Sequence, residues 1–202
     1  MNIQTLCVGP IQTNCYIIIA DNQEQTERFC AVIDPGDDFQ VIKQSLSALS
    51  YTTPSCNLTH IILTHAHFDH VGAVQDLHEA YPNAKFAVGE NEPLDSVYTF
   101  WGRKDLQIPK PNILLSHDDI IGSFRVIYTP GHTKGSICLY SQKDNILLSG
   151  DTLFKGSYGR TDLGGSMQDM RDSLEKLSKL PPSTKVLPGH GSPTTIEAEL
   201  RF

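Results

Sequence analysis

Short apolar runs separated by turn residues make up the first part of the chain. Tyr16–Ala20 and Cys30–Ile33 have the length of strands, and the turn signal Asp34-Pro35-Gly36 follows the second of them. Apolar residues then recur every three or four positions over 39–49, which predicts a helix with one buried face. His60–Thr64 predicts a further buried strand. Helical spacing returns over 71–81 and ends before a proline.

The later part of the chain repeats this pattern. Residues 90–119 contain three prolines and are predicted to be irregular. A helix is predicted at Met167–Leu180, before two prolines, and strands are predicted at Ala84–Val88, Phe124–Tyr128, Ile137–Tyr140, Ile146–Leu148 and Lys185–Leu187. Strands outnumber helices, and the helices fall between groups of strands. This order predicts an α/β layered sandwich with two sheets and helices outside them.

Composition narrows the class without identifying the protein. The 202 residues predict a single domain over 1–202. The net charge of −7 argues against nucleic acid and anionic membrane as partners. Five scattered cysteines without a Cys-x-x-Cys pair indicate buried thiols in a reducing compartment. The N-terminus has no signal-peptide pattern and no window is apolar enough to span a membrane, so we expect a cytoplasmic protein.

One segment carries far more polar chemistry than packing requires. His65, His67, Asp69 and His70 fall within six residues directly after a predicted strand. A strand end followed by a turn can direct His65 and His67 into one pocket, while Asp69 and His70 lie past the bend. Imidazole nitrogens and carboxylate oxygens are zinc-type ligands. The segment therefore predicts a metal site.

Three later strands end in a similar way. His132, Asp151 and His190 each follow an apolar strand and a glycine. Glycine permits a sharp turn and close approach of the backbone. A single histidine is more often structural, but four such strand ends in one chain predict a shared site.

With these motifs the chain resembles the metallo-β-lactamase-fold hydrolases, and within them the short glyoxalase II-like (hydroxyacylglutathione hydrolase-like) enzymes. The resemblance covers about Asn2 to Ile196. It implies an αββα four-layer sandwich with two central mixed sheets. Its markers are His65-x-His67-x-Asp69-His70, Pro130-Gly131-His132-Thr133-x-Gly135, Ser149-Gly150-Asp151-Thr152-Leu153-Phe154 and Pro188-Gly189-His190-Gly191.

The resemblance also implies a role for each ligand. It assigns His65, His67 and His132 to a first metal, and Asp69, His70 and His190 to a second, with Asp151 bridging both. We expect two Zn²⁺ per chain, with iron or manganese as alternatives. Two metals about 3.5–4 Å apart lower the pKa of a bound water towards about 7, so the expected nucleophile is a metal-bridging hydroxide. Asp69 and Asp151 are then the catalytic carboxylates that hold it.

Other polar residues near these motifs have two interpretations. Asp34 either bonds to a ligand histidine or is a simple turn carboxylate. His60 is expected to be structural or to contact a ligand from outside, whereas His78 and His117 are expected at the surface.

The loop after Asp151 bears on the substrate. In glyoxalase II enzymes the corresponding loop faces the substrate, so Arg160, Tyr158 and Lys155 are candidate substrate-binding residues; alternatively, Arg160 pairs with Asp162. The full-length family has an aromatic residue where Asp162 stands and a tyrosine where Ser192 stands. It also has a C-terminal glutathione-binding helical domain, and because the sequence stops at Phe202 we expect no counterpart of that domain here.

We therefore expect hydrolysis of a small-molecule thioester of the S-lactoylglutathione type, with looser or different recognition of any glutathione part. Residues 90–115, with Tyr98, Phe100 and Trp101, are expected to form a pocket wall or an oligomer contact, and the oligomeric state is left open.

Four other functions are compatible with parts of this pattern. Persulfide dioxygenases use the same scaffold with a single iron and also carry a Gly-Arg-Thr-Asp run, as at Gly159–Asp162. β-Lactam hydrolysis and RNA processing fit the expected location and the acidic charge less well. A non-catalytic metal-binding module is disfavoured, because a structural zinc site is closed by four ligands.

Overall fold

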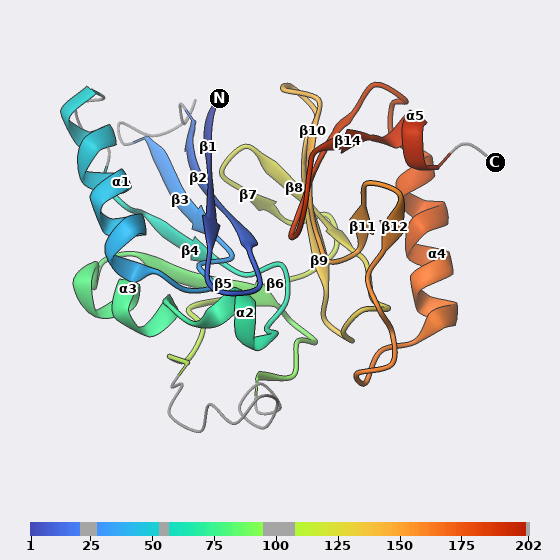
Figure 1. The fold of residues 1–202 in the computed structure, drawn as a ribbon, viewed down its shortest axis with the longest axis horizontal. Helices are drawn as coiled ribbons and strands as arrows, with labels where there is room; N and C mark the ends of the chain where they lie inside the picture. Colours follow the sequence, from blue (N-terminus) through green and yellow to red (C-terminus); the bar gives the residue numbers. More distant parts are fainter. Residues whose placement is uncertain (21–27, 53–56, 95–107, 201–202) are drawn as a thin grey trace. The chain divides into compact units, whose positions relative to one another are not determined.

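A computed structural model describes residues 1–20, 28–52, 57–94 and 108–200. The chain divides into two compact units, each built on a mixed six-stranded sheet (Figure 1). The first unit comprises Met1–Val88 and Leu94–Leu114, and the second comprises Gly89–Pro93 and Leu115–Phe202. The α/β class with two mixed sheets is thus confirmed. The single domain over 1–202 stays a prediction.

The first sheet has the order β1-β2-β3-β4-β5-β6. The pairs β1–β2 and β2–β3 are antiparallel, whereas the pairs β3–β4 and β4–β5 are parallel. The strands are β1 (Asn2–Val8), β2 (Thr13–Ala20), β3 (Phe29–Ile33), β4 (His60–Ile62), β5 (Lys85–Gly89) and β6 (Ile113–Leu115), and the helices are α1 (Phe39–Thr52), α2 (Phe68–Val71) and α3 (Val74–Ala80).

Burial explains the continuous apolar runs of this unit. Every residue of β2 and β3 is buried, so both faces of these strands select apolar side chains. One face packs with α1 and α3 in a core that contains Val32, Ile61, Ile42 and Leu77. Both helices lie on the same side of the first sheet in Figure 1. This core holds the ends of β3 and β4 in place, and the polar motif begins there.

The second sheet has the order β14-β13-β10-β9-β8-β7. Only β10 and β13 are parallel. Helix α4 begins at the cap Ser166, whose hydroxyl accepts from the Asp169 amide, and its Leu177 packs with Leu147 and Val186 of the sheet. The elements are β7 (Ile120–Ile121), β8 (Phe124–Tyr128), β9 (Ile137–Ser141), β10 (Ile146–Gly150), β11 (Leu153–Phe154), β12 (Ser157–Tyr158), α4 (Met167–Ser178), β13 (Lys185–Pro188), β14 (Thr194–Thr195) and α5 (Ile196–Glu199).

The predicted elements are confirmed, with shifts of a few residues at their ends, and three corrections are needed. β1 was not predicted, because its exposed and half-buried residues do not form an apolar run. Residues 90–119 are not wholly irregular, since β6 lies within them and is short. The helix predicted over 71–81 is α3, which begins only at Val74, and the short helix α2, which ends at Val71, precedes it within the polar motif. Tyr98, Phe100 and Trp101 lie outside the described residues.

Buried thiols were predicted, and three of them are confirmed. Cys15, Cys30 and Cys138 are buried, whereas Cys7 is exposed. Burial raises the pKa of Cys138 to about 11 and raises that of Cys15, with a smaller contribution from the charge of Asp34. These two thiols are therefore structural. Among the described residues, no helix has the length and apolar character needed to cross a membrane.

Candidate metal centre

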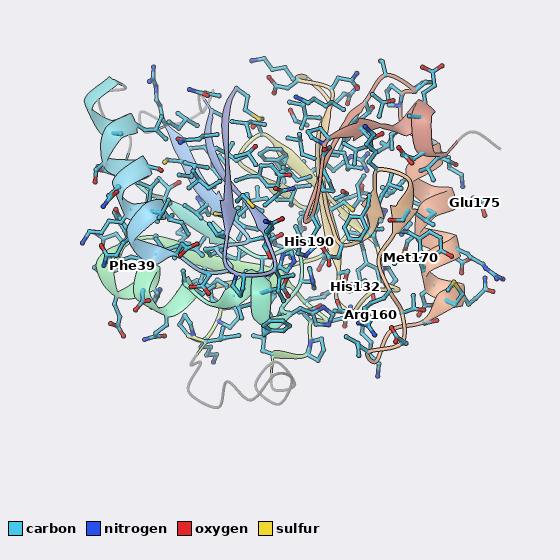
Figure 2. All side chains as sticks on the ribbon, in the orientation of Figure 1. Phe39, His132, Arg160, Met170, Glu175 and His190 are labelled. Atoms are coloured by element: carbon cyan, nitrogen blue, oxygen red, sulfur yellow. The ribbon has the colours of Figure 1, made fainter. Side chains whose placement is uncertain are left out.

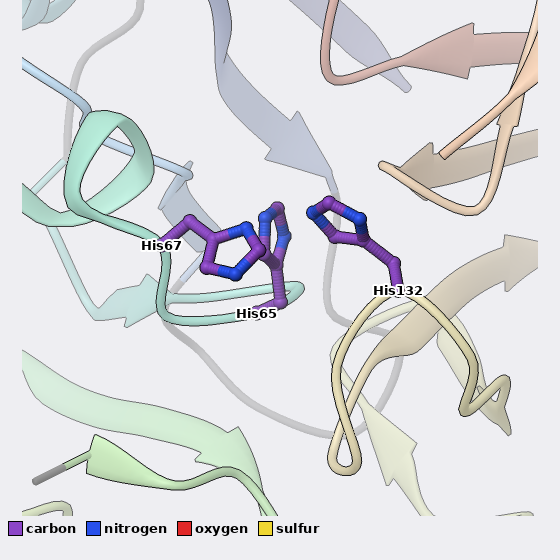
Figure 3. A group of neighbouring side chains, drawn as sticks. All are labelled: His65, His67 and His132. Carbon is purple, nitrogen blue, oxygen red and sulfur yellow. The ribbon is translucent and has the colours of Figure 1, made fainter. Parts of the chain in front are cut away.

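The first ligand group consists of His65, His67, Asp69 and His70, all in the first unit. His65 and His67 lie on the loop between β4 and α2, and their ring centroids are 4.8 Å apart (Figure 3). Asp69 and His70 lie on α2, past the bend, and His70 Nε2 is 3.5 Å from Asp69 Oδ2. The His65 and His70 ring centroids are 4.1 Å apart. The structure therefore brings the four predicted ligands of this segment together.

Asp34 orients two of these histidines, His70 directly and His65 through Thr64. Its Oδ1 accepts from the Thr64 amide at 2.8 Å, and its Oδ2 accepts from the Thr64 hydroxyl at 2.7 Å and lies 3.1 Å from His70 Nδ1. Because the Thr64 hydroxyl donates its single hydrogen to Asp34, its 3.1 Å contact with His65 Nδ1 is one in which the imidazole donates. Both rings thus engage Nδ1 and keep Nε2 for an ion.

This arrangement favours the first interpretation of Asp34. Its carboxylate is 1% exposed and lies beside His70, a predicted ligand, so Asp34 is not a simple turn residue. Its backbone has a φ of 51°, in the left-handed region that is costly for residues other than glycine. A strained buried carboxylate that orients imidazoles is typical of metal sites in proteins.

The second ligand group consists of His132, Asp151 and His190, all in the second unit (His132 and His190 are labelled in Figure 2). They follow β8, β10 and β13. Asp151 Oδ2 lies 3.5 Å from His132 Nε2 and 3.6 Å from His190 Nε2. The bond from the Gly189 amide to the Gly150 carbonyl, 2.8 Å long, joins two of the three strand ends.

These separations fit the ligands of an ion better than direct hydrogen bonds. An N–H···O bond at 3.6 Å is too long to count as one. Two ligands about 2.0–2.1 Å from one tetrahedral ion are roughly 3.3 Å apart. The 3.5 Å between Asp69 and His70, and the 3.5 and 3.6 Å around Asp151, are close to that separation. The ligand atoms within each group are therefore spaced as for divalent ions of the zinc type.

The tautomer of His132 follows from its partner. Its Nδ1 lies 2.7 Å from the Arg160 carbonyl oxygen. A carbonyl oxygen only accepts, so Nδ1 carries the hydrogen and Nε2 keeps a lone pair for an ion.

Gly159, which precedes Arg160, is a functional residue that sequence reasoning missed. A Cβ at this position would lie 1.7 Å from the Asp151 carbonyl oxygen and 3.1 Å from His132 Nδ1. The residue lies in a Gly-Arg-Thr-Asp run whose side chains drew attention, whereas its steric role depends on neighbours distant in the sequence. Only glycine lets this loop run so close to two ligands.

The backbone on either side of His132 is also anchored. Gly131 has a φ of 141°, and a Cβ there would lie 2.5 Å from the Met170 Cα of α4. Thr133 donates from its hydroxyl to Glu92 Oε2 at 2.6 Å. This contact had no signal in the sequence, because Glu92 lies 41 residues from Thr133.

The remaining candidate histidines lie elsewhere. His60 lines a cavity of about 510 Å³ at the start of β4, the end of the strand remote from the ligands, and its ring lies against Phe29 with the centroids 5.0 Å apart. Burial, assisted by the charge of Lys85, lowers the pKa of His60 to about 4. A structural role therefore fits His60. His117 is exposed, as predicted, and His78 is half-buried on α3.

The candidate substrate residues lie on the loop that follows Asp151. β11 and β12 form a hairpin that ends in Tyr158, which is 47% exposed, and Lys155 is exposed at its turn. Arg160 donates from Nε and Nη2 to the two carboxylate oxygens of Asp162, both at 2.7 Å. The Arg160 guanidinium lowers the pKa of Asp162 to about 2. The pairing considered as an alternative is thus present, and a role in substrate binding stays a prediction.

Comparison with known sequences places these features in a family. The family model described as "Metallo-beta-lactamase superfamily" matches residues 8–190. The chain is 34% identical to a probable metallo-hydrolase, YqgX, of Bacillus subtilis, over 98% of this chain and 94% of that protein. It is 31% identical to the hydroxyacylglutathione hydrolase GloC of Haemophilus influenzae, over 100% of this chain and 96% of that protein.

Solved structures agree with the sequence comparison. The crystal structure of the BLEG-1 B3 metallo-β-lactamase matches with a TM-score of 0.83 and 33% identity over 98% of this chain and 95% of that one. TTHA1623 in a di-iron-bound form matches with a TM-score of 0.79 and 37% identity over 98% of this chain and 97% of that one. With the two mixed sheets and the His/Asp ligand groups, these matches show that the chain belongs to the metallo-β-lactamase superfamily.

Proposed function

We propose that this protein is a binuclear metal-dependent hydrolase that cleaves a thioester of the S-lactoylglutathione type. The observation that carries the proposal is the position of Asp151, whose Oδ2 faces the Nε2 atoms of both His132 and His190. A carboxylate between two imidazoles can bridge two ions. Asp69 and His70 of the first unit supply further ligands of the same type.

The proposal places both ligand groups around one pair of ions. His65, His67 and His132, the three side chains of Figure 3, take the first ion, and Asp69, His70 and His190 take the second. Asp151 takes both. Each of these residues offers one ligand atom, as an imidazole nitrogen or a carboxylate oxygen. The identity of the metal is left to experiment, with zinc as the expected ion and iron or manganese as alternatives.

The bound ions would supply a water acidified towards neutral pH and a Lewis acid for the carbonyl oxygen. The chain's own residues prepare that chemistry. Asp34 and the Arg160 carbonyl fix the tautomers and directions of three imidazoles. Asp69 and Asp151 add negative charge beside them and orient the acidified water. Because these partners are already in place, little reorganisation is needed when the substrate binds.

A relative of similar length supports the choice of a thioester substrate. The GloC protein is matched along 96% of its length, so a hydroxyacylglutathione hydrolase of this size without a further domain exists among the relatives. We propose that exposed Arg160, Tyr158 and Lys155 bind the acyl or glutathione part. The bidentate pair with Asp162 uses the Nε and Nη2 edge of the Arg160 guanidinium and fixes its orientation. The other edge is thereby oriented before a substrate carboxylate binds.

The central experiment combines metal analysis with turnover. The purified protein is stripped with a chelator, reloaded with Zn²⁺, Fe²⁺ or Mn²⁺, and assayed with S-lactoylglutathione. Two metals per chain, thioester turnover and loss of that turnover on chelation would support the proposal. A protein with two metals and no turnover on any thioester would refute the substrate class.

The role of Arg160 needs a matched pair of variants. Arg160→Gln should raise KM for S-lactoylglutathione about tenfold or more, because a charge-assisted bond is lost. It should leave KM unchanged for a lactoyl thioester without carboxylates. Arg125→Gln is the control, since Arg125 is partly exposed and also pairs with an aspartate, Asp118, at 2.8 Å. Equal effects on both substrates would argue against contact with glutathione.

Two rival substrates belong in the same screen. A persulfide dioxygenase would hold a single iron and consume oxygen with glutathione persulfide, and the di-iron form of TTHA1623 makes iron a necessary arm of the test. A chromogenic cephalosporin tests β-lactam hydrolysis, which is the activity named for the BLEG-1 structure. A single iron, oxygen uptake and no thioester cleavage would refute the proposed function in favour of persulfide dioxygenation.

A further inference from the structure

We infer that Thr13 is a positioning residue that sets the affinity of the second metal position through Asp69. The inference rests on the proposed function, because it assumes the binuclear site. Thr13 is the first residue of β2 and is 1% exposed. Its hydroxyl donates to Asp69 Oδ2 at 2.9 Å, across 56 residues of sequence. Nothing in the hydrophobic pattern or the ligand motifs indicates this contact.

The hydroxyl is held by a fixed turn. Thr13 pairs with Val8 at the end of the β1–β2 hairpin, and the Gln12 amide donates to the Gly9 carbonyl at 3.2 Å. The Gly9 amide donates in turn to Asp38 Oδ2 at 2.8 Å. The hairpin end is thereby attached to the segment Asp34–Asp38.

The carboxylate is held by the same segment. Asp69 lies on α2, and the Ala73 amide just after α2 donates to the Pro35 carbonyl at 2.9 Å. His70, next to Asp69, lies 3.1 Å from Asp34 through its Nδ1. Since the hairpin and α2 are both fixed to Asp34–Asp38, the separation of the Thr13 hydroxyl from the Asp69 carboxylate is set by the fold.

A hydroxyl in this position prepares Asp69 for an ion without occupying it. A carboxylate has about four lone-pair sites, so one bond from Thr13 limits the rotation of the group and leaves acceptor capacity for a cation. Groups that orient metal ligands typically change affinity or activity by about 10–100-fold when they are removed. Thr13 contacts a ligand assigned to the second position, so the first position should keep its affinity.

The test measures Zn²⁺ binding to metal-free protein by titration with chelator competition, which resolves two successive affinities. Thr13→Val keeps the shape of the side chain and removes the hydroxyl. We expect one of the two affinities, that of the second position, to fall about 10–100-fold while the other is unchanged. Thr13→Ser, which keeps the hydroxyl, should stay within a few-fold of the wild type.

The control is Thr184→Val. Thr184 is also fully buried, and its hydroxyl donates to Asn145 Oδ1 at 2.7 Å in the second unit. This variant should lose stability through the same kind of lost bond and keep both metal affinities. If Thr13→Val does not fold, the comparison of Thr13→Ala with Thr13→Ser replaces it.

The outcomes separate this inference from the proposed function. Wild-type affinities in Thr13→Val, or an equal fall at both positions, would overturn the positioning role. A wild-type chain that takes up only one Zn²⁺ overturns it as well. A wild-type chain that binds two Zn²⁺ and cleaves no thioester would refute the proposed substrate class. The metal affinities of Thr13→Val would still decide the role of Thr13 in that case.

Discussion

The two ligand groups differ in how the chain builds them. The first comes from one continuous segment, His65 to His70, and is oriented chiefly by the side chains of Asp34 and Thr64. The second comes from three separate strand ends and is held largely by main-chain groups, among them the Arg160 carbonyl and the Gly189–Gly150 bond. A compact motif can be oriented by a few polar side chains, whereas a dispersed one needs the backbone of several loops.

The largest effect is expected where the second group depends on a single carboxylate. Asp151→Ala should lose both metals and reduce kcat/KM by about 10³-fold or more, because the variant loses the group that joins the two positions and with it most charge stabilisation at the site. Metal content and steady-state kinetics measure this. A variant that keeps near-normal rates would show that the binuclear mechanism is wrong.

The next largest effect is expected from a steric change beside the second group, Gly159→Ala. Gly159→Ala places a Cβ 1.7 Å from the Asp151 carbonyl oxygen, so the loop must move away from two ligands. We expect a loss of about 1–3 kcal/mol in the free energy of unfolding, typical of overpacking, with weaker metal binding.

Chemical denaturation and metal titration measure the effect of Gly159→Ala. Gly164→Ala is the control, because a Cβ there meets nothing within 4 Å and only its positive φ of 88° is strained. Equal metal affinities in the two variants would contradict the role assigned to Gly159.

Weakening the side-chain support of the first group should have a more moderate effect on metal binding. Asp34→Asn keeps the size of the residue and weakens its hold on His70 and Thr64, so metal affinity should fall about 10–100-fold. Asp119→Asn provides the matched control, since Asp119 accepts from the Ser116 amide at 2.7 Å in an exposed turn. If both variants bind metal as the wild type does, Asp34 is only a turn residue.

The smallest effect concerns His60, which lies outside both groups. Its pKa of about 4 in the folded chain is below the unfolded value of about 6.5, so the unfolded chain takes up a proton first as the pH falls. Its contribution to stability is therefore complete above pH 6.5 and is lost on acidification towards pH 4.

His60→Phe tests this difference. The variant should show a shallower decrease in the free energy of unfolding between pH 7 and pH 4.5, measured by denaturant titration, with thioester turnover unchanged. The exposed His117, changed to Gln, is the control. Identical pH dependence in wild type and His60→Phe would refute the burial argument.

The sequence was sufficient for the parts of the molecule that local chemistry determines. Continuous apolar runs predicted β2, β3 and the central strands of the second sheet, because strands buried on both faces carry mostly apolar residues. β1, an edge strand with polar and half-buried residues, gave no such signal. The His65–His70 segment predicted metal chemistry by its density of ligands alone.

Only the tertiary structure showed which groups orient those ligands. Thr13, Asp34, Thr64 and Gly159 act through contacts with residues that are mostly distant along the chain, and hydrogen bonds and steric approach over such separations leave no periodic pattern. The sequence by itself therefore determined the fold class and the candidate ligands of the opening motif, because these depend on residue type and local spacing. The folded chain decided the tautomer of His132, the support of Asp69 and the need for glycine beside Asp151, because these depend on distances in space.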